Sequence, residues 1–301
     1  MSLIQAQNVL IIYDDTTTNP NTVALKAALD AEGFTTTFSS VPETQWNNTN
    51  PSIDSFDAVV HLNGTTYAQE MPPQGQIAIT NFVQNNGGLY VGFEWNAYLA
   101  GENMMQDMLD LILFTRGSGS NGALTLDIEP SQVSNPIMNN VPANFGVSAG
   151  KNKGSIKAFT TQPATVLMKD GAYDAVAYRN FGNGHVLGFH HAGNFMNYPV
   201  LADANIQKII TNFITHYYNT LSVPNVSQDA PTKITLYPNP ATDTIQLKGF
   251  NEHVNYEVYS ILGKEVLKGQ VGEFDTIDIS KLQTGVYMIK IENTTLKFIK
   301  R

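Results

Sequence analysis

The chain has 301 residues, of which 42% are hydrophobic and 14% charged, a composition typical of two or three packed domains rather than of a disordered protein. It has no cysteine, which excludes disulfides, thiolate metal sites and a cysteine nucleophile. The first 230 residues carry 8 Lys and Arg against 18 Asp and Glu, which argues against nucleic acid and anionic membranes as partners. No apolar run approaches the roughly 20 residues of a transmembrane segment.

Residues 1–7 fit no regular element. We interpret them either as the remnant of a secretory signal peptide cut after Ala6 or as a disordered N-terminus.

The next segment alternates short apolar runs with amphipathic stretches. The runs predict buried strands, and Asn21 and Gly33 are the expected ends of the first helix. The expected elements are a strand at Asn8–Tyr13, a helix from Thr22, strands at Thr35–Ser39 and Phe56–Leu62, a helix at Gln74–Gln84 and a strand at Leu89–Glu94. This alternation predicts a mostly parallel α/β sheet flanked by helices.

The stretch from Ala123 to Val200 is rich in strand signals. The expected strands are Ala123–Ile128, Ser155–Thr160, Ala164–Met168, Ala175–Tyr178 and His185–Phe189. A long amphipathic helix follows, with one apolar stripe made of Ile206, Ile209, Ile210, Phe213, Ile214 and Tyr217. We therefore expect a first domain over residues 8–218.

Residues 219–233 are polar and contain Pro, Ser and Asn, as expected of a linker. Residues 234–301 then contain seven short strand signals separated by turns, which predicts a small all-β, Ig-like sandwich. They lie near Leu236, Ile245–Leu247, Tyr256–Tyr259, Glu265–Leu267, Thr276–Ile279, Val286–Ile291 and Leu296–Ile299.

Several motifs of this second domain occur in a characteristic order. They include Pro238, Asn239 and Pro240 at its start, Gly263 and Lys264 at an internal turn, Gly285 and Tyr287 in a late segment, and Lys297 and Lys300 at the end. With these motifs, residues 235–301 resemble the C-terminal sorting domain of the type IX secretion system of Bacteroidetes. The resemblance implies passage through the periplasm, handling by the outer-membrane translocon and its cargo-binding barrel proteins, and release from the cell or attachment to its outer surface.

The first domain resembles the class I glutamine-amidotransferase-like, flavodoxin-like fold, and within it the ThuA-like proteins. The resemblance rests on Val9–Ile12, Phe56–Val60, Gly87–Phe93, Gly182–Val186 and the closing helix. Glu94 stands where amidotransferases carry their cysteine. Glutaminase activity is excluded because a carboxylate does not replace the thiolate nucleophile.

Ligands of open parallel sheets bind beyond the carboxyl ends of the strands. The polar or aromatic residues expected there are Asp14, Asp15, His61, Asn63, Glu94, Trp95, His190, His191 and Asn194. Each has a structural alternative: Asp14 and Asp15 as loop caps, His61 as a buried hydrogen-bonded residue, Trp95 as packing. His190 and His191 point to opposite sides if the strand continues.

Glu94 is the most suggestive of these residues. The helix that follows it should favour its charged form, which suits a ligand anchor or a metal ligand better than a general acid. No spacing of histidines or aspartates predicts a metal site, and no cofactor is expected.

Three functions remain open for the first domain. The first is a non-catalytic ligand-binding or adhesive module. The second is a carbohydrate-active hydrolase or isomerase that uses Glu94 with His190 or His191. The third is passive cargo. The association of ThuA-like proteins with sugar use makes a carbohydrate the candidate ligand.

Overall fold

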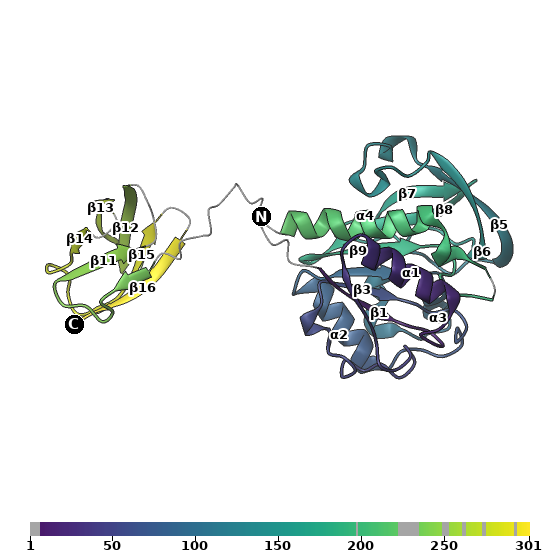
Figure 1. The fold of residues 1–301 in the computed structure, drawn as a ribbon, viewed down its shortest axis with the longest axis horizontal. Helices are drawn as coiled ribbons and strands as arrows, with labels where there is room; N and C mark the ends of the chain where they lie inside the picture. Colours follow the sequence, from purple (N-terminus) through teal and green to yellow (C-terminus); the bar gives the residue numbers. More distant parts are fainter. Residues whose placement is uncertain are drawn as a thin grey trace. The chain divides into compact units, whose positions relative to one another are not determined.

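The computed structural model describes residues 7–196, 198–221, 235–248, 253–260, 263–272, 275–291 and 294–301. Residues 1–6 and most of the expected linker at 219–233 lie outside these ranges. The chain divides into two compact units between Pro224 and Asn225, here called the α/β unit and the C-terminal unit (Figure 1). No helix in the described ranges is long and apolar enough to cross a membrane.

One half of the sheet in the α/β unit is parallel. Its strands are β1 (Asn8–Ile12), β2 (Thr35–Phe38), β3 (Ala58–His61), β4 (Leu89–Gly92) and β9 (Gly184–Phe189). They run in the order β2-β1-β3-β4-β9, with every adjacent pair parallel. Strands β3 and β4 are buried along their whole length, which is why they read as continuous apolar runs.

The other half of the sheet is antiparallel and continues from β9. Its strands are β5 (Gly119–Ile128), β6 (Asn144–Asn152), β7 (Thr165–Asp170) and β8 (Tyr173–Phe181). They complete the order β9-β8-β7-β5-β6 of a mixed nine-stranded sheet. This is the β-rich region that the sequence indicates, and it makes the sheet mixed, with four parallel and four antiparallel neighbouring pairs.

The strand expected at Ser155–Thr160 is wrong. In this segment the structure has only an isolated bridge between Ile156 and Phe114. The segment is held from two sides, because the Ile156 amide donates to Asp174 Oδ2 at 3.3 Å and the Lys157 amide donates to the Leu113 carbonyl at 2.8 Å. Beyond this single bridge the segment forms no ladder among the described strands.

The helices of the α/β unit lie on both faces of the sheet (Figure 1). The four α-helices are α1 (Pro20–Ala31), α2 (Pro73–Gln84), α3 (Trp95–Gly101) and α4 (Ala204–Leu221). Short 3-10 turns lie at η1 (Ile53–Ser55), η2 (Gln106–Leu111), η3 (Pro130–Gln132), η4 (Pro136–Met138) and η5 (Val200–Ala202). Helix α4 ends three residues beyond the expected boundary at 218.

The cap of α1 differs from the expectation. Asn19, not Asn21, is the N-cap, and its side-chain oxygen accepts a hydrogen bond from the Asn21 amide at 3.0 Å. Asn21 lies inside the helix and is buried. Its side-chain amide donates a hydrogen bond to the Tyr198 carbonyl at 2.7 Å. Gly33 follows the helix with a φ of 93°, the left-handed conformation that favours glycine.

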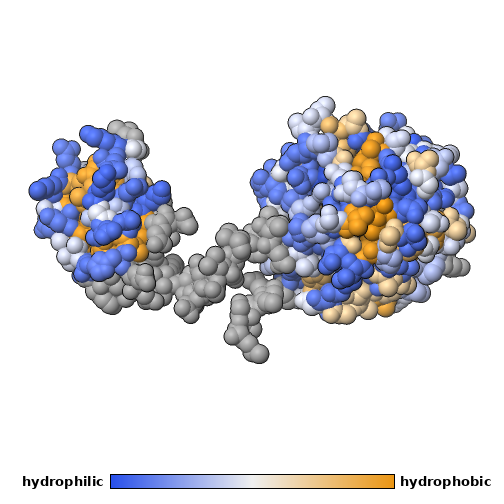
Figure 2. Space-filling model, turned by 90° about the horizontal axis from the view of Figure 1, so that it is seen from above, coloured by the Kyte–Doolittle hydropathy of each residue, from blue (hydrophilic) through white to orange (hydrophobic). Residues whose placement is uncertain are grey.

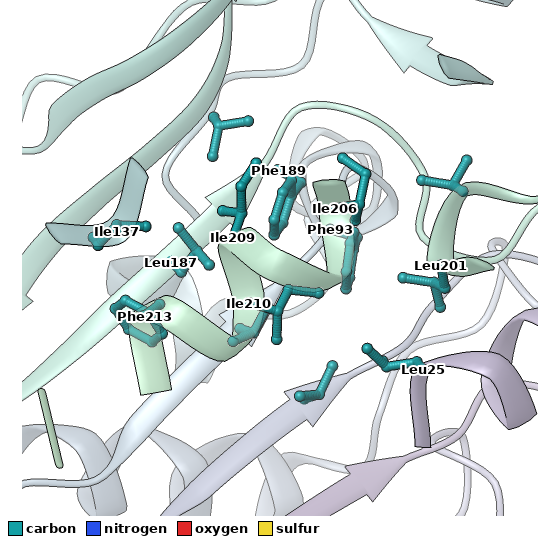
Figure 3. Close-up of a cluster of buried hydrophobic side chains, with 14 of the residues drawn as sticks. Leu25, Phe93, Ile137, Leu187, Phe189, Leu201, Ile206, Ile209, Ile210 and Phe213 are labelled. Carbon is teal, nitrogen blue, oxygen red and sulfur yellow. The ribbon is translucent and has the colours of Figure 1, made fainter. Parts of the chain in front are cut away.

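Alternate residues of the central strands face two separate cores. Val9 and Ile11 pack on the α1 and α4 side, whereas Leu10 and Ile12 pack on the α2 and α3 side. Figure 3 shows the first core, in which Ile206, Ile209, Ile210 and Phe213 of α4 lie against Phe93, Leu187 and Phe189. The predicted apolar stripe of α4 is therefore its core-facing side. On the face seen in Figure 2, hydrophilic residues surround a narrow hydrophobic band.

The C-terminal unit has two antiparallel sheets around its own core. One sheet contains β10 (Thr235–Tyr237), β11 (Thr244–Lys248) and β14 (Thr276–Asp278). The other contains β13 (Glu265–Val271), β12 (Val254–Ser260), β15 (Gly285–Ile291) and β16 (Thr294–Lys300). Each of the seven strand signals of the sequence corresponds to one of these strands, and Ile245, Val258, Ile289 and Phe298 are fully buried between the sheets.

Candidate functional site

Loops from the ends of three parallel strands meet at Asp14. Asp14 follows β1 and is fully buried. Its carboxylate accepts hydrogen bonds from the Thr65 amide at 2.5 Å, the Thr66 amide at 3.0 Å and the Thr66 hydroxyl in the loop after β3. The side-chain amide of Asn194, beyond β9, donates to Asp14 Oδ2 at 3.3 Å and to Asp15 Oδ1 at 3.4 Å. Three predicted site residues are thus in direct contact.

His61 belongs to a chain of buried polar groups next to this junction. Its Nε2 lies 3.1 Å from a Glu43 carboxylate oxygen, and its Nδ1 lies 3.0 Å from the Tyr90 hydroxyl. The Asn96 side-chain amide donates to the Tyr90 hydroxyl at 3.0 Å. Burial raises the pKa of both the Glu43 carboxyl and the Tyr90 hydroxyl. The Thr66 hydroxyl lies 3.4 Å from Glu43, which joins this chain to Asp14.

Asn63 lies at the end of β3 and is fully buried. Neither polar atom of its side chain has a hydrogen-bond partner among the described residues. Buried amides are normally paired, so Asn63 is an exception among the described residues.

Glu94 connects β4 to α3, where it is the N-cap residue. Its side chain is 6% exposed and makes no capping hydrogen bond. Burial raises its pKa to about 8, and Arg116 opposes this only in part. The expectation that the helix favours the charged form is wrong, because desolvation outweighs the effect of a helix of only seven residues.

Glu94 lines a cavity of about 290 Å³ beyond the strand ends. The remaining lining residues are Trp95, Tyr98, Arg116, Gly117, Gly119, Ser120, Asn121, Gly150, Lys151 and Phe195. Both cations of the wall already have acidic partners, because Lys151 pairs with Asp170 at 2.5 Å and Arg116 pairs with Glu102. Among the described residues the Glu94 carboxyl has no hydrogen-bond partner, which makes it the unpaired acid of this cavity.

Four aromatic rings form a cluster at the same place. Tyr67 stacks on Trp95 with ring centroids 4.6 Å apart, and Phe195 meets Trp95 edge-on at 4.8 Å. Tyr98 contacts Trp95 at 5.3 Å and carries Arg116 over its own face at 4.2 Å. The buried indole N–H of Trp95 has no acceptor within the described ranges. An apolar wall thus adjoins an unpaired carboxyl and an unpaired donor.

His190 is held as a neutral structural residue. Its Nδ1 lies 2.5 Å from the Asp174 carbonyl, its Nε2 accepts from the Gly154 amide at 3.1 Å, and its ring stacks on Phe114 at 4.6 Å. Burial lowers its pKa to about 4.

His191 is fully buried, and its ring lies 5.2 Å from Phe189 and 6.2 Å from Phe93. Burial lowers its pKa to about 4 as well. Its Nδ1 lies 3.2 Å from the Ala192 carbonyl, and its carbonyl accepts the Glu94 amide. Neither His190 nor His191 lines the Glu94 cavity.

The other cavities have fewer ionisable side chains that are free to bind a ligand. One of about 550 Å³ lies over β5 and β6, and its ionisable residue Asp203 caps α4 through the Asn205 amide. In the described ranges no group of three or more His, Asp or Glu side chains is arranged to hold a metal ion.

The sequence reasoning missed most of the residues around Glu94. Tyr67, Tyr98, Phe195, Arg116 and Lys151 come from five different segments. Of these, only Tyr67 and Phe195 could have been predicted from the sequence. Each is an aromatic residue that follows polar residues at the end of a parallel strand.

The motifs of the C-terminal unit are also brought together. Asn239 lies between Pro238 and Pro240 at the exposed start of the unit, and its side chain bonds the backbone of β16 next to Lys297. Gly263 takes a φ of 77° in the turn before β13, and the Tyr287 hydroxyl donates to the Gln283 carbonyl at 2.9 Å. Lys300 is 7% exposed, and its ammonium donates to the Arg301 carbonyl at 2.6 Å.

Residues 235–301, which span all seven strands of this unit, match the family of secretion system C-terminal sorting domains. The C-terminal unit is a type IX sorting domain. This sorting domain implies export and a location at the cell surface or outside the cell. No curated protein matches the chain.

The α/β unit has the fold of ThuA-like proteins. A ThuA-like protein from Parabacteroides merdae is 15% identical with a TM-score of 0.50, and the match covers 75% of this chain and 94% of that one. A cytoplasmic protein from Salmonella typhimurium LT2 is 11% identical with a TM-score of 0.52, over 70% of this chain and 99% of that one. The α/β class and the ThuA-like fold expected from the sequence are confirmed.

Proposed function

We propose that the type IX system exports this protein so that its α/β unit acts as a non-catalytic ligand-binding or adhesive module outside the cell. The chain passes through the periplasm, engages the outer-membrane translocon and its cargo-binding barrel proteins, and is released or attached at the surface. The ligand site is the Glu94 cavity. The observation that carries this proposal is the unpaired carboxyl of Glu94, a residue that is only 6% exposed, beside the aromatic cluster.

A carbohydrate fits this cavity chemically. Sugar rings present apolar C–H faces, which pack on aromatic side chains such as Trp95 and Phe195. Their hydroxyls both donate and accept, so a sugar ring can pair with the Glu94 carboxyl. Each hydrogen bond that a ligand makes in the cavity contributes about 0.5–1.5 kcal/mol net.

Binding is favoured over catalysis by the state of the two histidines. His190 and His191 have pKa values of about 4 and lie outside the cavity lining, so neither is poised for proton transfer at neutral pH. A carbohydrate-active hydrolase or isomerase remains the second candidate on one observation. The pKa of Glu94, about 8, suits a general acid near neutral pH.

A glycan array probed with the full chain separates these functions. Binding by the wild type that is lost in Trp95→Ala and Glu94→Gln, with no release of product, is the expected result. The control is Tyr173→Ala, because Tyr173 is 41% exposed and lies outside the cavity. Turnover of a bound glycan that Glu94→Gln abolishes would replace the binding function by the catalytic one.

Deletion of residues 234–301 tests the export half of the proposal. In the native bacterium the truncated chain should stay folded and accumulate in the periplasm, whereas the full chain should become accessible to protease added to intact cells. Surface delivery of the truncated chain at the normal level would refute the route.

A further inference from the structure

Two short paths of contacts connect the buried Asp14 with Trp95. On one path Asp14 bonds the amide and hydroxyl of Thr66, and the next residue, Tyr67, stacks on Trp95 at 4.6 Å. On the other path Asp14 accepts from Asn194, and the next residue, Phe195, meets Trp95 at 4.8 Å. Tyr67 and Phe195 also contact each other, with centroids 6.3 Å apart, which closes the ring of contacts.

The two loops are also in direct backbone contact. A Cβ atom on Gly64 would lie 1.3 Å from the Asn194 carbonyl oxygen, so the loop after β3 passes against the loop after β9 with no space for a side chain. Asp14 lies at this crossing with an exposure of 0% and does not line the cavity. Its four hydrogen bonds therefore hold the loops rather than a ligand.

We propose that Asp14 is a positioning residue for the Glu94 cavity, because it holds the loops that place Tyr67 and Phe195 against Trp95. The ligand site of the proposed function thus depends on a residue that no ligand touches. The hydroxyl of Thr66 and the side-chain amide of Asn194 are the donors through which Asp14 acts.

The chemistry of Asp14 explains why a carboxylate is needed at this crossing. A carboxylate offers two oxygens that only accept, and here each oxygen receives two donors. An amide in its place turns one acceptor into a donor, which then faces N–H groups of Thr65, Thr66 or Asn194. Bonds to charged groups are stronger than neutral ones, so this substitution should loosen both loops together.

The two tryptophans provide a measurement that needs no ligand. With 5-fluorotryptophan the chain gives two ¹⁹F NMR signals, one from Trp95 and one from Trp46, which is fully buried and bonds the Pro51 carbonyl. Trp95→Phe assigns the signals, and Trp46 serves as the internal reference for the fold. Acrylamide quenching of the fluorescence measures the exposure of Trp95 in the same variants.

Matched pairs separate positioning from general stability. We expect Asp14→Asn and Thr66→Val to move or broaden the Trp95 signal and to raise its quenching at least twofold, with the Trp46 signal kept. Asp127→Asn removes a charge from an exposed residue outside both loops, and Thr66→Ser keeps the hydroxyl, so both should resemble the wild type. On the glycan array, Asp14→Asn and Thr66→Val should bind at least tenfold more weakly than their controls.

The outcomes distinguish this inference from the function on which it rests. An unchanged Trp95 signal in folded Asp14→Asn and Thr66→Val proteins overturns the positioning role, whatever the array shows. Equal effects of Thr66→Val and Thr66→Ser overturn it too. An array to which the wild type does not bind refutes the proposed function alone, because the ¹⁹F and quenching results still decide what Asp14 does.

Discussion

Asn239 ties the start of the sorting domain to its last strand through Ile299. The Ile299 amide donates to Asn239 Oδ1 at 2.9 Å, and the Asn239 side-chain amide donates to the Lys297 carbonyl at 2.9 Å. The Ala241 amide continues the contact by donating to the Ile299 carbonyl at 2.8 Å. Two motifs about 60 residues apart are therefore one structural feature.

Asn239→Ala should open this contact. It removes two solvent-exposed hydrogen bonds to the backbone of β16, each worth about 0.5–1.5 kcal/mol. Hydrogen exchange in the full chain should show faster exchange of the Ile299 amide, by about tenfold or more. Asn255→Ala, at an exposed position of β12, is the control. Unchanged exchange at Ile299 would show that Asn239 does not hold the last strand.

Glu94→Gln should change how stability depends on pH. The pKa of Glu94 is about 8 in the folded protein, against 4.5 for a free side chain, so the folded state binds the extra proton between these values. The free energy of unfolding therefore falls as pH rises from 4.5 to 8, by an amount on the order of 4–5 kcal/mol from this group.

The free energy of unfolding can be measured by urea titration at pH 5 and at pH 9. In Glu94→Gln the decrease between these two pH values should be smaller than in the wild type by the contribution of Glu94. Glu32→Gln, at an exposed position, should retain the fall seen in the wild type. A Glu94→Gln protein with the same pH dependence as the wild type would mean that Glu94 is ionised at neutral pH.

His190 and His191 should remain neutral across the physiological range. Their folded pKa values of about 4 lie below the usual 6.5, so their imidazole NMR signals should not move between pH 5.5 and 8. The stability that each contributes is fully present above pH 6.5 and is lost as the pH falls towards 4. His253, with a side chain that is 73% exposed, provides the reference signal. Titration of either buried ring near pH 6.5 would reopen an acid–base role.

Gly64→Ala should be strongly destabilising. The added Cβ would lie 1.3 Å from the Asn194 carbonyl oxygen, so the two loops would have to separate. We expect a loss of more than about 3 kcal/mol in the free energy of unfolding, measured by denaturant titration. Gly146→Ala on β6 is the matched control, because its nearest atom would be 3.8 Å away. A Gly64→Ala protein as stable as Gly146→Ala would contradict the close approach of the loops.

The parallel half of the sheet and the closing helix follow from the sequence because burial imposes clear patterns on them. Strands buried on both faces require apolar runs, and α4 buries one stripe. Strand β6 left no such trace, since it lies at the sheet edge and contains Gly, Ser and Asn. Helix α3 has seven residues and no side-chain cap, which gives a pattern too short to recognise.

The candidate site was predictable only where one rule applied. Residues at the carboxyl ends of parallel strands lie close together. This rule is enough to predict Asp14, Glu94, Trp95 and Asn194 from the sequence. The partners of His61 are 18 and 29 residues away from it, and no local spacing announces such contacts. The raised pKa of Glu94 depends on the walls of the cavity, which come from four segments.

The most direct test of whether the Glu94 cavity is a ligand site compares the binding of wild type and Trp95→Ala, as full chains, to a glycan array. Trp95 contacts three other rings of the cluster and lines the cavity with Glu94. We expect the wild type to be retained on at least one glycan and Trp95→Ala not to be retained, with Tyr173→Ala bound as well as the wild type. Retention of Trp95→Ala at the wild-type level would contradict the assignment of this cavity as the ligand site.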